Sequence, residues 1–240
     1  MRQLISLLRL FIATLLLGAF ASSTMGQWSN ALEPTSLTHE RATEAFAHRQ
    51  YALALHLFET LKEQATSPTS DLYVEASYYS ALSALALYHK DAVYKVNNFV
   101  KQFPESPLAI EAKWELANFH YKRRNYSKAA AAFQDIRVRA LDAPRRDEYR
   151  FKLGHCHFER EEYELARVPL YEVLDVEGPF QSAAQYYFSH IAYLNDQPQV
   201  ALDGFEKIAD DPNFSELSNP SYTFGIYSLS KHCRYKNKKI

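Results

Sequence analysis

The amino-acid sequence predicts an all-α protein, an α-solenoid built from about five helix-turn-helix units. The first observation is a small residue that recurs at a nearly constant interval. The recurring residue is Ala54, Ala92, Ala129, Ala166 and Ala201, at gaps of 38, 37, 37 and 35 residues. Self-similarity at such a period is typical of stacked arrays rather than of one compact globule.

The second observation is the composition of the 240-residue chain. Hydrophobic residues make up 47% and aromatic residues 14%, enough for a substantial core and too much for a disordered tail. Only 6 residues are Gly, while strong helix formers are frequent, which disfavours turn-rich β folds and glycine-loop nucleotide sites. A formal net charge of −1 lacks the excess of positive charge that nucleic-acid binding requires, so no nucleic-acid partner is expected.

Each unit is expected to contain two helices joined by a polar break. In the second helix a large apolar residue follows the Ala after four positions, and these residues are Phe58, Val96, Phe133, Leu170 and Phe205. Three positions before the Ala stands Tyr51, Tyr126 or Tyr163, with His89 and Pro198 as departures. In the first helix, Leu116 and Ala117 of the third unit match Leu153 and Gly154 of the fourth. Small residues at the crossing let the two backbones approach.

Prolines are expected to separate the units, because proline cannot continue a helix. They are Pro68, Pro104, Pro144, Pro179 and Pro212. Pro169 lies within the second helix of the fourth unit, where a local kink is expected.

The pattern of Leu-Gly, nine residues to Tyr, three to Ala, four to an aromatic residue and a closing Pro resembles the tetratricopeptide repeat (TPR), a 34-residue helix-turn-helix unit. Residues 110–133 and 147–170 fit closely, and residues 35–68, 73–105 and 182–212 fit loosely. The resemblance implies a right-handed superhelix whose first helices line a concave groove that binds a protein or peptide, with no cofactor.

The resemblance also implies which residues face that groove, namely the fifth, ninth and twelfth of each unit. They are Trp114, Asn118, Tyr121, Phe151, His155, Phe158, Tyr186, His190 and Tyr193, and in the second unit Ser77, Ala81 and Ala84. This set would form an aromatic column with a polar middle row, suited to an extended peptide or an amphipathic helix. The alternative is that these rings pack against each other and only hold the superhelix together. Both interpretations stay open.

Other conspicuous residues favour structural roles. His155, Cys156 and His157 are adjacent on a predicted helix and point in different directions, so no metal site is expected there. The basic run Lys122 to Arg124 is expected in a solvated turn. No catalytic motif stands out, and a disulfide between Cys156 and Cys233 is left open.

The ends of the chain define the expected boundaries. Residues 1–26 have the basic start and short apolar run of a signal peptide, with cleavage after Gly26 or Ala21, and an uncleaved anchor is the alternative. A linker over 27–34 and the repeat array over 35–215 would follow. Residues 216–240 would be a partial sixth repeat or a basic tail, from a natural end or from a truncated longer array.

These observations lead to one expected function and two alternatives. We expect an exported, non-enzymatic interaction scaffold without a transmembrane segment in the mature chain, located in the periplasm and acting in envelope assembly or secretion. The first alternative is a carbohydrate or cell-wall binding module, since rows of Tyr and Trp also stack on sugar rings. An enzyme is the least favoured class, because convergent polar groups are not visible in the sequence.

Overall fold

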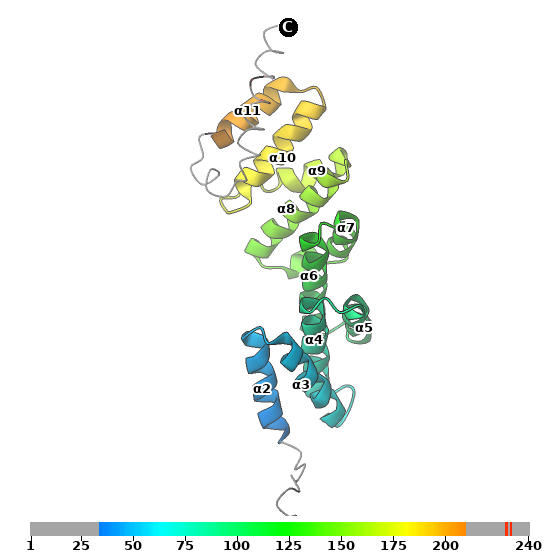
Figure 1. Cartoon of the computed structure of the whole chain (residues 1–240). Helices are drawn as coiled ribbons and strands as arrows, with labels where there is room; N and C mark the ends of the chain where they lie inside the picture. The colour runs from blue at the N-terminus through cyan, green and yellow to red at the C-terminus, as the bar shows by residue number, and fades with distance from the viewer. Residues whose placement is uncertain (1–33, 210–228, 230, 232–240) are drawn as a thin grey trace, which may run out of the picture.

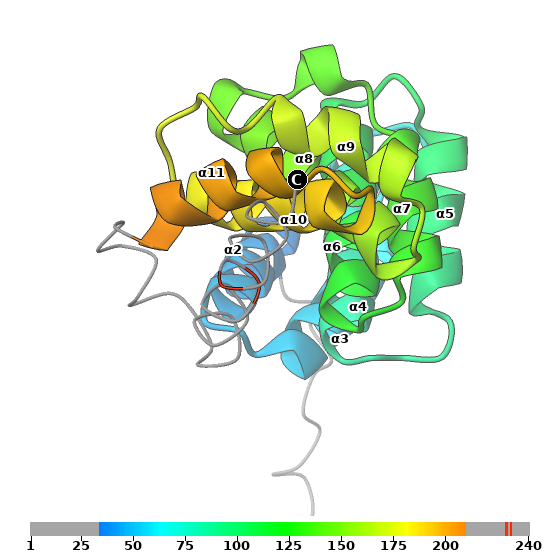
Figure 2. The same ribbon diagram turned by 90° about the horizontal axis from the view of Figure 1, so that it is seen from above.

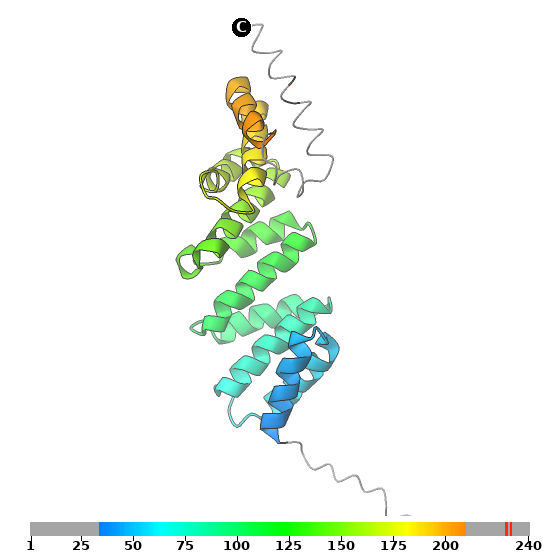
Figure 3. The same cartoon turned by 90° about the vertical axis from the view of Figure 1, so that its left-hand side faces the viewer.

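The computed structural model describes residues 34–209 together with Leu229 and Lys231, and every regular element in these residues is helical. The elements are α2 (Thr35–Ala47), α3 (Tyr51–Gln64), α4 (Asp71–Ala86), α5 (Ala92–Gln102), α6 (Pro107–Lys122), α7 (Tyr126–Gln134), the 3-10 turn η1 (Val138–Ala140), α8 (Ala143–Glu159), α9 (Tyr163–Tyr171), α10 (Gln181–Leu194) and α11 (Pro198–Ala209). Successive helices pair into five hairpins that stack along one axis, as Figures 1 and 3 show. The predicted fold class, an α-solenoid of helical hairpins, is confirmed.

Local sequence signals set where the first helices begin. Ser70, Ser106 and Asp142 precede α4, α6 and α8, and the side chain of each accepts a hydrogen bond from a backbone N–H of the first turn. Pro144 lies in the first turn of α8, where a missing N–H costs nothing, rather than at the end of α7 as the sequence suggested. Pro169 lies inside α9, as expected.

Every hairpin turn contains one residue with a left-handed backbone, and none of these residues is Gly. They are Arg49, Tyr88, Arg124, Glu161 and Asp196, with φ between 55° and 60°. In each turn the next residue donates its N–H to a carbonyl five positions earlier, as Asn125 does to His120 at 3.0 Å. This shared geometry closes the end of each first helix. It also supplies a backbone landmark by which the five units can be aligned.

This alignment corrects the register of the second unit. The repeated Ala follows the left-handed residue after five positions in four units but after four positions in the second, where the N–H of Ala92 bonds to the carbonyl of His89. Groove positions in α4 that are counted back from Ala92 are therefore wrong by one residue. The groove positions predicted as Ser77, Ala81 and Ala84 are instead Tyr78, Leu82 and Leu85.

Most repeat residues meet where the two helices of a unit cross, whereas Leu116 and Leu153 pack against the preceding unit. Ala54, Ala92, Ala129, Ala166, Ala201, Ala117, Phe58, Phe133 and Phe205 are all completely shielded from solvent, Leu116 and Gly154 are buried, and Tyr126, Leu153 and Tyr163 are half-buried. The crossing of α8 and α9 is tight at Gly154, where an added Cβ would lie 2.6 Å from Cγ of Leu170. Only the absence of a side chain allows α8 and α9 to approach this closely.

The hairpins stack as two layers. Among the described residues, α4 packs directly on α6 and α8 on α10, whereas no two second helices approach each other as extensively. Viewed down the long axis in Figure 2, α6 and α10 lie toward the middle and α5 and α7 toward one side. The first helices therefore form an inner layer, and the second helices diverge around it. Leu229 is helical and packs against the cluster formed by α8 to α11.

Candidate functional site

The nine residues predicted to face the groove all lie on the first helices, but they do not form an open aromatic column. Trp114, Asn118, Phe151 and Tyr186 are buried, and Tyr121, His155, Phe158, His190 and Tyr193 are half-buried. Their rings contact one another across neighbouring helices, so much of their surface stabilises the array. Only the half-buried members offer surface to a partner.

Three contacts join α6 to α8 along the inner layer. A hydrogen bond of 2.7 Å links the Tyr121 hydroxyl to Nδ1 of His155. Nζ of Lys152 donates to Oδ1 of Asn118 at 2.5 Å, and the guanidinium of Arg145 donates to both carboxylate oxygens of Glu111 at 2.6 and 2.8 Å. The sequence separation is 34 residues in each case.

Equivalent positions of these two units are 37 residues apart, whereas the contacting residues are 34 apart. Each of these α6 residues therefore contacts the α8 residue three positions before the equivalent one. The joint between α8 and α10 has the same offset. There the period is 35, and the close ring pairs His155–Tyr187 at 4.7 Å and Phe158–His190 at 5.2 Å are separated by 32 residues. Three residues are about one helical turn. Each first helix is thus shifted by one turn against the next.

Cations cover the ring of Trp114. Cζ of Arg145 lies 6.0 Å and Nζ of Lys152 lies 5.8 Å from its centroid, distances at which a cation attracts an aromatic face. Lys152 also lies 5.3 Å from the ring centroid of Tyr121, and Trp114 packs edge to face on Phe133. Trp114 therefore anchors this joint and does not present a free face.

Charged side chains accompany these rings on the same helices. Glu115, Lys122 and Glu159 are exposed, and the largely buried Lys152 pairs with Glu148. Loss of surrounding water raises the pKa of Glu115, against the lowering effect of Lys122. Glu115 is therefore an exposed charge on the same helix as Trp114, Asn118 and Tyr121.

Two histidines lie among the rings of the inner layer. The ring of His155 is parallel to that of Phe151, and its Nε2 lies 3.3 Å from Glu159. Burial lowers the pKa of His155, with Glu159 opposing the shift, and burial also lowers the pKa of His190. Nδ1 of His190 is buried and has no hydrogen-bond partner among the described residues.

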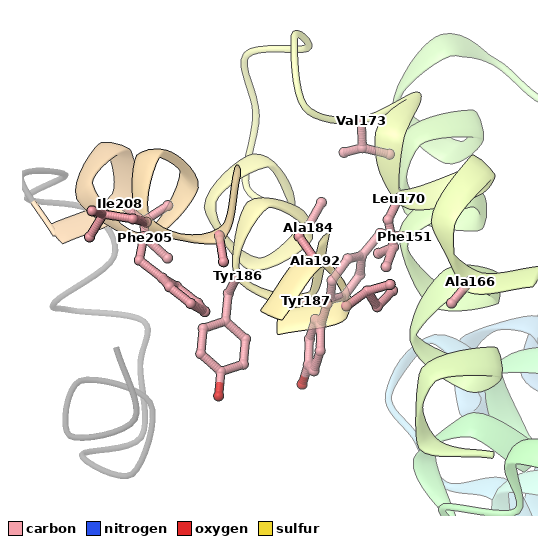
Figure 4. Packing of buried hydrophobic residues seen from close by; sticks show 13 residues of the cluster. Phe151, Ala166, Leu170, Val173, Ala184, Tyr186, Tyr187, Ala192, Phe205 and Ile208 are labelled. Carbon is pink, nitrogen blue, oxygen red and sulfur yellow. The ribbon is translucent and has the colours of Figure 1, made fainter. Parts of the chain in front are cut away.

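The next helix completes this ring cluster. Figure 4 shows Tyr186 and Tyr187 side by side on α10, with both hydroxyl groups on the same side of the helix. Tyr187 is buried and contacts Phe151, His155 and Phe158. It is thus the residue that joins the aromatic side chains of α8 to α10.

The adjacent residues His155, Cys156 and His157 diverge, as the helix predicted. Cys156 lies in the core between α6, α7 and α8, where burial raises its pKa to about 12, and Nδ1 of His157 lies 2.7 Å from Glu162. In the described part of the chain no group of three potential metal ligands converges. Cys233 lies outside the described residues, so the structure does not test a disulfide between Cys156 and Cys233. Lys122 ends α6, and Arg123 and Arg124 form the following turn, as expected.

Sequence reasoning missed residues beside the positions it counted. Glu115, Lys152 and Tyr187 each directly follow a predicted groove residue, and each lies on the inner layer. Residues 34 positions apart with opposite charge or matching hydrogen-bonding groups, such as Asn118 and Lys152, were the sequence signal that could have identified the joint between α6 and α8.

The comparisons with known proteins agree with this architecture. Residues 115–182 match the family model of the tetratricopeptide repeat. A chain of nearly identical TPR-like repeats from a Podosopora anserina protein described as a putative kinesin light chain is similar at 18% identity and a TM-score of 0.57, over 78% of this chain and 100% of that one. A singly substituted form of that protein is similar at 19% identity and a TM-score of 0.54, over 73% and 93%. No curated protein matches the chain.

The fold is therefore that of a TPR solenoid, a class that commonly mediates protein–protein interaction. Identities this low establish the fold alone. None of the described helices combines the length and the apolar character needed to cross a membrane.

Proposed function

We propose that the protein is an exported, non-enzymatic scaffold that binds a peptide segment of another protein along the inner layer of its helices. The observation that carries the proposal is the combination of half-buried rings on α6, α8 and α10 with exposed charges on α6 and α8. Tyr121, His155 and Phe158 expose part of their rings, and Glu115 and Glu159 lie on the same helices. Partly exposed rings beside charged groups suit a segment that carries both apolar and charged side chains.

Carbohydrate binding has less support. Sugars stack on open aromatic faces, whereas Trp114 is 5% exposed and lies beneath two cations. Tyr121, His155 and Phe158 are half-buried and contact neighbouring rings. We therefore favour a peptide over a glycan.

Charge reversal on the inner layer tests this function without disturbing the core. A displayed peptide library is selected on the wild-type chain, and the selected peptides are titrated against a Glu115→Lys, Glu159→Lys double variant. We expect affinity to change at least ten-fold, because two charges on the contact surface reverse sign. The matched control reverses Glu105 and Glu177, which are exposed and lie outside the inner layer. Equal affinities for both double variants would reject the inner layer as the binding surface.

Export rests on the amino-terminal sequence, and residues 1–33 lie outside the described part of the chain. We propose cleavage of a signal peptide and release into the periplasm, where the protein would act in envelope assembly or secretion. Expression of the full chain in a Gram-negative host, followed by fractionation and amino-terminal sequencing, checks this. The expected result is a periplasmic product that begins at Gln27 or Ser22. An intact product in the cytoplasm would contradict it.

A further inference from the structure

The turns that join the two helices of each unit form a surface that we call the turn edge. They span residues 48–50, 87–91, 123–125, 160–162 and 195–197. Contacts connect the second to fifth turns, or the helix ends beside them, into one continuous surface. The contacts are Cζ of Arg123 at 5.5 Å from the ring centroid of Tyr88, the rings of Tyr126 and His155 at 5.4 Å, and Nδ2 of Asn195 donating to Glu164 at 3.1 Å.

The third turn is strongly basic. Exposed cations occupy four positions in this turn and the helix ends beside it, namely Lys122, Arg123, Arg124 and Lys128. No acidic residue lies between residues 116 and 134. Within the ranges that the structure describes, none of the four cations forms an ion pair. Burial and the charges of Lys128 and Arg123 together lower the pKa of His120, which agrees with a positive potential at this turn.

The fourth turn is acidic. Between residues 158 and 164 one cation, Arg160, lies among four carboxylates, those of Glu159, Glu161, Glu162 and Glu164, and all of these except Glu162 are exposed. Glu159 ends α8, and Glu161 follows two residues later. A helix dipole disfavours negative charge at its C-terminus, so the hairpin itself does not explain these two carboxylates. The sign of the charge thus reverses between adjacent turns.

Arg124 and Glu161 hold equivalent positions in these two turns. Each is the left-handed residue of its turn, with φ of 56° and 60°, and both are exposed. A basic turn beside an acidic turn is complementary to the same surface after a two-fold rotation. The third turn of one copy then meets the fourth turn of the other, and the same contact forms a second time. A polyanion or an acidic peptide would match the third turn only.

Apolar side chains are also exposed on the turn edge. Tyr88 in the second turn is 63% exposed, and Leu194, directly before the fifth turn, is 44% exposed. When the third turn of one copy faces the fourth turn of the other, the second turn faces the fifth. The arrangement therefore brings an exposed ring of one copy toward an exposed aliphatic side chain of the other, which adds apolar burial to the ionic contacts.

We propose that the turn edge binds a second copy of this chain, in an antiparallel, two-fold symmetric dimer whose axis lies between the third and fourth turns. The third turn of each copy binds the fourth turn of the other. Because the contact depends on exposed charges, screening by salt should weaken it strongly. The dimer forms without the peptide proposed above, so either proposal can fail alone.

Sedimentation velocity of the full chain measures self-association directly. We expect a dimer in about 50 mM NaCl and an association at least ten-fold weaker in about 500 mM NaCl, because salt screens exposed charges. A chain that stays monomeric at low salt would overturn the proposal, and so would a dimer whose affinity salt leaves unchanged.

Charge reversal locates the contact. An acidic variant carries Lys122→Glu, Arg124→Glu and Lys128→Glu, and a basic variant carries Glu161→Lys and Glu164→Lys. Each variant alone should associate at least ten-fold more weakly than the wild-type chain, because both contacts then bring like charges together. An equal mixture of the two variants should associate about as tightly as the wild-type chain, since every acidic turn again faces a basic one.

A matched control reverses three exposed cations at the connections between units, through Lys101→Glu, Arg137→Glu and Arg139→Glu. This control variant should dimerise like the wild-type chain. Equal weakening in the control and the acidic variant would assign the effect to net charge and overturn the proposal. A mixture that associates no more tightly than its two components would also overturn it.

Discussion

The hydroxyl group of Tyr121 lies 2.7 Å from Nδ1 of His155, and this hydrogen bond joins two first helices of neighbouring repeats. Tyr121→Phe keeps the ring and removes only the bond. We expect the free energy of unfolding to fall by about 1–2 kcal/mol, because a half-buried imidazole nitrogen loses its partner. Urea denaturation measures this change. The control is Tyr88→Phe, whose exposed hydroxyl should matter by less than about 0.5 kcal/mol. Equal stabilities of the two variants would show that the bond contributes nothing.

Gly154→Ala tests the tight crossing of α8 and α9. Helix propensity alone favours Ala by about 1 kcal/mol, but the added methyl group would lie 2.6 Å from Cγ of Leu170. We expect packing to dominate and stability to fall by about 1–3 kcal/mol. In Gly178→Ala the new methyl group meets no atom within 4 Å, so stability should change little. Thermal unfolding of both variants compares them, and a gain in stability for Gly154→Ala would contradict the tight crossing.

Glu161→Gly tests the left-handed turns. Glu161 has φ of 60° and is exposed, so its side chain contributes strain and little packing. Gly relieves the backbone strain in the folded chain but makes the unfolded chain more flexible. We expect the free energy of unfolding to rise by about 0.5–1 kcal/mol. Glu161→Ala controls for loss of the side chain, because Ala keeps the strain. Chemical denaturation should therefore rank the Gly variant above the Ala variant.

Two half-buried histidines of the inner layer predict a loss of stability in mild acid. Burial lowers the pKa values of His155 and His190 in the folded chain, so below the unfolded value of about 6.5 the unfolded chain binds more protons. The free energy of unfolding that these two histidines contribute above that pH is therefore lost as the pH falls through their pKa values in the folded chain. Denaturation at pH 7.5 and pH 5 measures the difference. It should shrink in a His155→Gln, His190→Gln variant and persist in His48→Gln, a change at an exposed position. A difference that persists in the double variant would assign it to other groups.

Much of the fold could be predicted because the repeated Ala and the apolar residue four positions later are buried in every unit. Burial imposes the same small and large residues at each helix crossing, so periodicity reveals them. The register of the second unit could not be predicted, since its left-handed residue lies four rather than five positions before the repeated Ala. That difference is visible only in the backbone, where Tyr88 adopts the left-handed conformation four residues before Ala92.

The candidate site was harder to predict because it depends on how neighbouring units dock. A single unit indicates that Trp114 and Asn118 share a helix face, but not that Lys152 of the next unit covers them. The offset of one turn between first helices decides which side chains meet. The residue pattern within one repeat does not specify that offset.

The offset also determines which chemistry holds each joint. At the joint between α6 and α8, Asn118 accepts a hydrogen bond from Lys152 and Glu111 forms a bidentate ion pair with Arg145, and these polar bonds are spread over two helical turns. At the joint between α8 and α10, ring contacts such as His155–Tyr187 take their place. One joint is therefore held mainly by directional polar bonds and the other mainly by aromatic packing.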